Sequence, residues 1–268
     1  MTAAGKWDPR LRRARELAAI HPYAAEGLRF YEGIAGFQRS LYEGLEPAPG
    51  TPKQARAPGS LREGFEPRLL VPGFSLYLAL VGKIAPAPLA HSAAELKARS
   101  ATDQEAALAD FWWRTGALDS AEALLAWTFL QPYAEHLADH TEPLEVHGAP
   151  PLCPLCSGAP QVGVLRPQGD GGRRSLICSL CATEWGFRRI FCPACGEEDV
   201  NKLPVYTAEE LPNVRVEACD TCRRYIKTID MTKEGRAVPV VDELAAIPLS
   251  LWAAENGYEK IWENLLGV

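Results

Sequence analysis

The eight cysteines form four CxxC pairs, and their type and spacing point most directly to chemistry. A CxxC turn directs both sulfurs to one side, and two such turns supply the four tetrahedral ligands that Zn²⁺ or a single iron takes. The sequence therefore predicts two sites, each binding one metal ion through four cysteines. The pairs are Cys153 with Cys156, Cys178 with Cys181, Cys192 with Cys195, and Cys219 with Cys222.

The spacing also predicts which pairs combine. There are 21 residues between the first and second pairs and 23 between the third and fourth, and each intervening segment is typical of a hairpin. We therefore expect a sequential grouping, and a cross-braced grouping of pairs one with three and two with four is the alternative. The expected ligand sets are Cys153, Cys156, Cys178 and Cys181 for one site and Cys192, Cys195, Cys219 and Cys222 for the other.

Other uses of these thiols fit the pattern less well. A thioredoxin-type dithiol needs one CxxC at a helix N-terminus, and iron–sulfur clusters usually follow different spacings. A reducing compartment, which we expect for this chain, disfavours structural disulfides. His136 and His140 are spaced i, i+4 on a predicted helix, but they lack the glutamate of an HExxH motif, so a pair without metal is the expectation.

A site closed by four thiolates has no open coordination position for hydrolytic catalysis. Zinc would make it structural, whereas iron could pass one electron. Pro154 and Pro193 stiffen their turns, and Gly196 supplies a residue that is free to take a positive φ, a place held by Ser157 in the first pair. The turns of zinc ribbons and rubredoxins look alike, so the spacing does not choose the metal.

The segments before the cysteines are predicted to be helical, and those between them to be short strands. Asp103 and Asp119 are expected N-caps, and the aromatic residues of the helical part are expected to fill its core. These aromatic residues are Phe111, Trp112, Trp113 and Trp127. The expected helices are 8–22, 24–45, 74–84, 92–100, 103–115 and 119–138; the expected strands are 161–167, 173–180, 183–191, 201–207, 214–219 and 223–230.

The predicted fold class is a multi-domain α plus small β protein. An N-terminal helical domain precedes two tandem rubredoxin-like or zinc-ribbon modules, each with four cysteines, and a helical C-terminal tail. The expected boundaries are 1–148 for the helical domain, with a Pro/Gly-rich loop at about 46–67, then 149–190 and 191–236 for the modules and 237–268 for the tail. Each module is too small for a core of its own, so its metal would supply much of its folding free energy.

Charge and hydropathy limit the classes of partner that this chain is expected to bind. The net charge is −6, and residues 151–236 carry 12 Lys/Arg and 11 Asp/Glu, which two divalent ions with eight thiolates would turn negative. This balance disfavours nucleic acid as a partner. The longest apolar run, 74–82, is too short to span a bilayer, and the N-terminus lacks the pattern of a signal peptide, so we expect a cytoplasmic protein without a membrane partner. No catalytic constellation is recognisable, and an enzyme is not predicted.

Several stretches resemble the formate dehydrogenase accessory protein FdhE family. They are "CPLCSGAP", "RSLICSLCATEWGFRRIFCPACGEED", "ACDTCRRYIKTIDM" and "VVDELAAIPLSLWAAENGY", and the resemblance covers roughly 150–260. It implies a cytoplasmic assembly factor that contacts the catalytic subunit of a molybdenum- or tungsten-dependent formate dehydrogenase. It also implies two rubredoxin-like modules holding iron or a related metal on the eight cysteines. A rubredoxin-like electron carrier acting on the client cofactor and a zinc-ribbon nucleic-acid binder are the alternatives.

Overall fold

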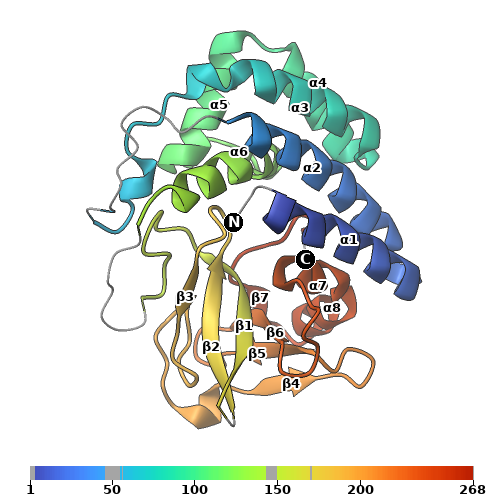
Figure 1. Cartoon of the computed structure of the whole chain (residues 1–268), viewed down its shortest axis with the longest axis vertical. Coiled ribbons are helices and arrows are strands. Elements are labelled where there is room, and N and C mark those ends of the chain that lie inside the picture. The colour runs from blue at the N-terminus through green and yellow to red at the C-terminus, as the bar shows by residue number, and fades with distance from the viewer. Residues whose placement is uncertain (1–3, 46–54, 56, 143–149, 170, 268) are drawn as a thin grey trace.

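The structure is a computed structural model that describes residues 4–45, 55, 57–142, 150–169 and 171–267. Its N-terminal half is helical, and the helices form a layer on one side of a sheet (Figure 1). Helix α1 packs on α2, α2 on α6, and α3 on α4. The helices are α1 (Ala4–Ile20), α2 (Ala25–Gly44), α3 (Val71–Ile84), α4 (Ala87–Ala98), α5 (Ala101–Trp113) and α6 (Ser120–Asp139).

Helix α6 is the central element of the helical layer. Buried residues occur on several of its faces, from Leu125 to Leu137, because neighbouring helices and the cysteine-rich part both cover it. Trp112 and Trp127 are buried as predicted, but Trp113 is half exposed and does not belong to the core. Since Trp112 and Trp113 are adjacent on α5, they point in different directions, and only Trp112 faces inward.

The capping residues differ from the prediction at one helix. Asp119 is the N-cap of α6, where its side chain accepts a hydrogen bond from the Glu122 backbone N–H. Asp103, however, lies three residues inside α5, and Ser100 is the N-cap. The Ser100 and Asp103 side chains complete a reciprocal capping box, which explains why the helix starts earlier than predicted.

In the part of the chain that the structure describes, the strands form one seven-stranded sheet with the order β3-β2-β1-β6-β5-β4, and β7 pairs with β6. The predicted hairpin of β1 and β2 is confirmed by their antiparallel pairing. Of the predicted strands at 183–191 and 201–207, only Glu184–Gly186 and Val205–Thr207 pair as strands. The strands are β1 (Pro160–Gln168), β2 (Gly171–Cys178), β3 (Glu184–Gly186), β4 (Val205–Thr207), β5 (Val214–Ala218), β6 (Arg224–Asp230) and β7 (Glu259–Lys260).

A parallel pairing of β1 with β6 joins the two cysteine repeats. Gly163 lies opposite Thr228 in this pairing, and the strands approach very closely there. A Cβ placed on Gly163 would lie 2.2 Å from the Thr228 Oγ1 atom. Glycine is therefore required by the close approach, and the two repeats share one sheet.

The C-terminal tail contains two helices and a strand. Helices α7 (Pro239–Ala245) and α8 (Ile247–Glu255) lie beside the sheet, with α7 packed on α1 (Figure 1). The predicted helical tail is confirmed by α7 and α8, and it also contains β7, which pairs in parallel with β6. Gly257 has a φ of 74°, and this left-handed residue ends α8 and turns the chain into the strand.

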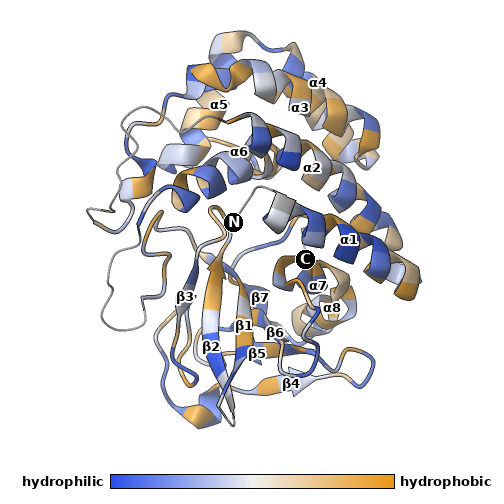
Figure 2. Ribbon diagram, in the orientation of Figure 1, coloured by the Kyte–Doolittle hydropathy of each residue, from blue (hydrophilic) through white to orange (hydrophobic). Residues whose placement is uncertain are grey.

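Two clusters of buried apolar residues stabilise the molecule. The larger one runs from the helices, including α7, into the first cysteine repeat, and the smaller one lies between the sheet and α8. Figure 2 shows the same distribution in β2, which is hydrophobic towards the helices, at Leu176–Cys178, and hydrophilic at its other end. The first repeat therefore folds against the helices.

Two predicted features lie partly outside the described residues. The boundary between the helical domain and the first module, at 148/149, falls on residues that the structure does not describe, and so does most of the first half of the 46–67 loop. In its second half Ser60–Arg62 forms a short 3-10 turn. The domain boundaries stay a prediction. Among the described residues, no helix combines the length and the apolar character needed to cross a membrane.

Candidate metal centres

The first cluster brings together Cys153, Cys156, Cys178 and Cys181. The two turns face each other, with Sγ–Sγ distances of 3.6 Å from Cys153 to Cys181 and 3.3 Å from Cys156 to Cys178. All four sulfur atoms lie within 4.8 Å of one another, and all four residues are buried. The first turn precedes β1 and the second follows β2, so the hairpin brings the two turns together.

The second cluster brings together Cys192, Cys195, Cys219 and Cys222. Its Sγ–Sγ distances are 3.8 Å from Cys192 to Cys222 and 3.7 Å from Cys195 to Cys219. These four sulfur atoms also lie within 4.8 Å of one another. The structure thus groups the pairs sequentially, one with two and three with four, rather than in the cross-braced alternative.

All four turns share one backbone conformation. The residue after the second cysteine takes a positive φ in each: 55° at Ser157, 53° at Ala182, 80° at Gly196 and 57° at Arg223. A backbone N–H also points at a cysteine sulfur, as from Gly158 to Cys156 at 3.3 Å. Glycine marks only one of the four positions, so the sequence does not reveal that Ala182 and Arg223 adopt the left-handed conformation.

The geometry of both clusters fits a tetrahedral metal site. With metal–sulfur bonds of about 2.3 Å, the edge of a sulfur tetrahedron is about 3.8 Å. The four measured Sγ–Sγ distances, from 3.3 to 3.8 Å, are close to this edge. They are far longer than a disulfide bond of about 2.05 Å, and every cysteine is a free thiol. Each cluster can therefore hold one metal ion, and the sulfur ligands suit zinc or iron equally.

The helical layer holds the first cluster through backbone atoms of its turns. The Arg62 Nε donates to the Cys156 carbonyl at 2.8 Å, and the Leu61 N–H donates to the Leu155 carbonyl at 3.1 Å. On the second turn, the Trp127 Nε1 and the Gln131 Nε2 each donate to the Ser179 carbonyl at 2.9 Å. Nothing in the sequence marks these helical residues, because their role depends on tertiary contact.

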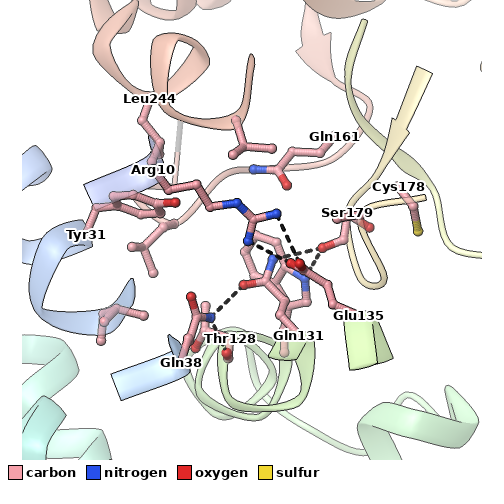
Figure 3. Close-up of a pocket in the computed structure, with 15 residues that line it drawn as sticks. Arg10, Tyr31, Gln38, Thr128, Gln131, Glu135, Gln161, Cys178, Ser179 and Leu244 are labelled. Carbon is pink, nitrogen blue, oxygen red and sulfur yellow. Dashed lines mark hydrogen bonds and ion pairs between the residues drawn. The ribbon is translucent and has the colours of Figure 1, made fainter. Parts of the chain in front are cut away.

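A small cavity of about 30 Å³ lies between the helices and the second turn of the first cluster (Figure 3). Arg10 pairs there with Glu135 in a bidentate contact of 2.8 and 3.1 Å. The Gln38 Nε2 donates to the Gln131 Oε1 at 2.9 Å, and Gln131 continues the network to Ser179. Polar groups of α2 and α6 are thus connected to the turn that carries Cys178, and the Arg10–Glu135 pair lines the same cavity.

The second cluster lies near the surface. Cys192 and Cys219 are buried, but Cys195 is exposed and Cys222 is half-buried. A pocket of about 310 Å³, here called the side pocket, is lined by Cys192 and Cys219. The two sites therefore match in sulfur geometry and differ in their access to solvent.

His136 and His140, the histidine pair spaced i, i+4, lie together at the C-terminal end of α6. His136 and His140 stack with ring centroids 4.4 Å apart, and His136 is buried against Tyr42. Among the described residues, the groups of three or more potential ligands that could hold an ion are the two cysteine clusters.

Arginine residues around the clusters are paired with carboxylates. Arg174 is buried and contacts the Glu217 Oε2 at 2.6 Å. Such pairing leaves less free basic surface for a phosphate backbone and disfavours nucleic-acid binding further. The remaining pairs are Arg188 with Glu198 at 2.8 Å, Arg223 with Asp220 at 3.1 Å and Arg224 with Glu259 at 3.7 Å.

Comparison with known proteins identifies the relatives of this chain. Residues 152–189 match the family described as "FdhE, central domain", and residues 190–266 match "FdhE, C-terminal domain". The chain is 34% identical over 141 residues to the FdhE homologue of Aquifex aeolicus, covering 52% of this chain and 50% of that protein. The homologue of Stutzerimonas stutzeri is 36% identical over 119 residues, covering 43% of this chain and 38% of that protein. The alignments thus span about half, or less, of these relatives.

A solved structure extends the similarity over the helical half. The crystal structure of the FdhE protein from Pseudomonas aeruginosa matches 100% of this chain and 97% of that chain, with a TM-score of 0.73 and 26% identity. Both cysteine clusters lie in the segments matched by the two family domains. From these matches together, we conclude that the chain belongs to the FdhE family.

Proposed function

We propose that the protein is a cytoplasmic assembly factor for a molybdenum- or tungsten-dependent formate dehydrogenase and binds the catalytic subunit of that enzyme. The observation that carries this proposal is membership of the FdhE family, with both cysteine clusters in place. The role itself comes from the family resemblance seen in the cysteine motifs.

We further propose that each cluster binds one metal ion, iron or zinc, through its four thiolates. The sulfur geometry described above supports this assignment. A bound iron would allow one-electron transfer, whereas zinc would serve the fold. The thiolates hold the ion, and the backbone N–H groups that point at them, such as that of Gly158, offset part of their charge.

A role in binding rather than catalysis is consistent with these sites. Four sulfur ligands fill a tetrahedral ion completely, so neither cluster leaves a position for a substrate. The protein would then act on its client by contact, by electron transfer, or by both. We propose no catalytic residue.

A binding experiment with the client tests the proposed function. The zinc- or iron-loaded chain is mixed with the catalytic subunit of a formate dehydrogenase from the same organism, and complex formation is followed by size-exclusion chromatography and calorimetry. We expect a defined complex, and formate oxidation that is lost in cells lacking the chain and restored by its return. A folded, metal-loaded chain that neither binds the subunit nor restores activity would contradict the proposal.

The exposure of the second cluster favours one additional candidate function, a rubredoxin-like electron carrier. Electron transfer requires close approach to the metal, and Cys195 reaches the surface. Anaerobically purified protein with bound iron would show thiolate-to-iron absorption bands that bleach reversibly on titration with dithionite. A colourless protein that contains only zinc would rule out this function.

A further inference from the structure

We propose that the two metal sites have different tasks: the first is closed as long as the core is folded, and the second is the site where metal is exchanged. This inference rests on the proposed binding of one ion per cluster and goes beyond it. The incoming ligand would be a small chelating molecule or thiol that enters the side pocket or approaches Cys195. The departing ion moves to that ligand, and the four freed thiolates take up protons from water.

The cysteine side chains of the first cluster are buried away from solvent. Each of its four cysteines is at most 2% exposed, and all four belong to the large apolar cluster that includes the helices. A pocket of about 320 Å³ borders both turns through Leu152, Gly158, Ser179 and Leu180, but no cysteine lines it. Cys178 itself lines the cavity of about 30 Å³ between the helices and the second turn (Figure 3). Since one water needs about 10–15 Å³ of such volume, this cavity has room for about two waters and excludes a chelator.

Hydrogen bonds also hold the backbone of the two turns that carry the first cluster. Helical residues donate to carbonyls of both turns, from Arg62 to Cys156 and from Trp127 and Gln131 to Ser179. Figure 3 shows Gln131 reaching Ser179 from α6. These turns cannot separate unless the helices move with them, so release of this ion requires opening of the core.

The second cluster is reached from two sides. Cys195 is exposed on one side, and Cys192 and Cys219 line the side pocket on the other. A volume of about 310 Å³ lies at the lower end of the range of small-molecule sites. A donor atom can therefore contact this ion or its sulfurs without any rearrangement of the fold.

The surroundings of the second cluster suit a visiting ligand or partner. Ile190 and Val205 line the side pocket and are 50% and 53% exposed, and Val200 nearby in sequence is 60% exposed. Arg189 also lines this pocket, whereas Arg215 and Arg224 there pair with Glu217 and Glu259. The side pocket therefore offers exposed apolar side chains beside Cys192 and Cys219, whereas the pocket beside the first cluster has no cysteine in its lining.

A release experiment on the full chain tests the proposal. Protein loaded with two zinc ions is mixed with an excess of 4-(2-pyridylazo)resorcinol, and the absorbance of the zinc complex is followed. Samples taken at intervals are treated with N-ethylmaleimide, and the labelled cysteines are located by peptide mass spectrometry.

We expect two phases of one zinc each, with rates that differ at least about tenfold, because only the slow phase requires opening of the core. In the fast phase the label should appear on Cys192, Cys195, Cys219 and Cys222. Release of both ions at one rate, or early labelling of Cys153, Cys156, Cys178 or Cys181, would overturn the proposal. A chain that binds no metal would instead contradict the proposed function before this experiment begins.

Two variants distinguish local closure of the first metal site by the helices from the stability of the whole fold. The double variant Trp127→Phe with Gln131→Leu removes the two donors to Ser179, and we expect the slow phase to accelerate about tenfold while the fast phase is unchanged. The matched control is Tyr77→Phe, which removes a buried hydrogen bond to Thr128 without touching either cluster. Equal acceleration in both variants would show that the helices do not close the first site locally.

Discussion

Replacing Gly158 by alanine is predicted to weaken metal binding at the first cluster. Gly158 has no positive φ, so its backbone tolerates alanine, and the conflict is steric. The added Cβ would lie 2.7 Å from the Cys178 sulfur and 3.0 Å from the Cys156 sulfur. Both neighbours are expected ligands, so neither can move aside without distorting the sulfur tetrahedron.

The expected size of the effect follows from overpacking of a rigid site. Such insertions cost about 1–3 kcal/mol. Because about 1.4 kcal/mol corresponds to a factor of ten, the affinity of the first site should fall roughly 5- to 150-fold. The affinity of the second site should stay the same, since Gly158 contacts none of its cysteines.

Competition with a chromophoric chelator measures both affinities. Gly235→Ala is the matched control, because no atom lies within 4 Å of the Cβ that it adds. Circular dichroism establishes that both variants are folded. If Gly158→Ala binds two ions as tightly as the unchanged chain, the assignment of the first cluster as a compact metal site is wrong.

Three further variants test the fold around the sites. Gly163→Ala should lower the free energy of unfolding, measured with urea, by about 1–3 kcal/mol. Adding Thr228→Ala should recover part of this loss, and a double variant without any recovery would contradict the close contact between β1 and β6. Ser157 has a φ of 55°, which glycine adopts without strain, so Ser157→Gly should stabilise the protein by about 1 kcal/mol and raise Tm by about 2–4 °C. A lower Tm would contradict backbone strain at Ser157. Glu243→Gln leaves Lys227 buried without its carboxylate and should cost about 3–5 kcal/mol at pH 7. Burial lowers the pKa of Lys227 to about 8 in the unchanged chain, so this side chain loses its charge, and its need for the carboxylate, as the pH rises through 8. The cost of Glu243→Gln should therefore be smaller at pH 9 than at pH 7, and an equal cost at both would contradict it.

The grouping of the cysteines could be predicted because it depends on local chain geometry. A CxxC turn and a hairpin of about twenty residues determine which sulfurs meet, and Gly-rich residues between β1 and β2 mark the hairpin. The left-handed residues Ala182 and Arg223 had no such signal, since they are not glycines. Their conformation is imposed by the arrangement of the sulfurs rather than by the residue type.

Long-range packing explains what the sequence did not predict. The parallel pairing of β1 with β6 joins segments over sixty residues apart, and only Gly163, a glycine inside a strand pattern, hints at a close approach. The two-residue strand β7 is too short for a periodic signal. The two clusters have similar sulfur geometry but differ in burial, because residues outside the cysteine repeats, such as Arg62 and Trp127, cover the first one. The sequence of the cysteine repeats therefore does not predict this difference in burial.

The central claim is that the chain holds one metal ion in each cluster of four cysteines. Metal analysis with X-ray absorption spectroscopy, on protein purified without air, tests it most directly. The structure predicts two ions per chain, each surrounded by four sulfurs at about 2.3 Å. Fewer than two ions in the folded protein, or nitrogen and oxygen ligands in place of sulfur, would contradict the claim.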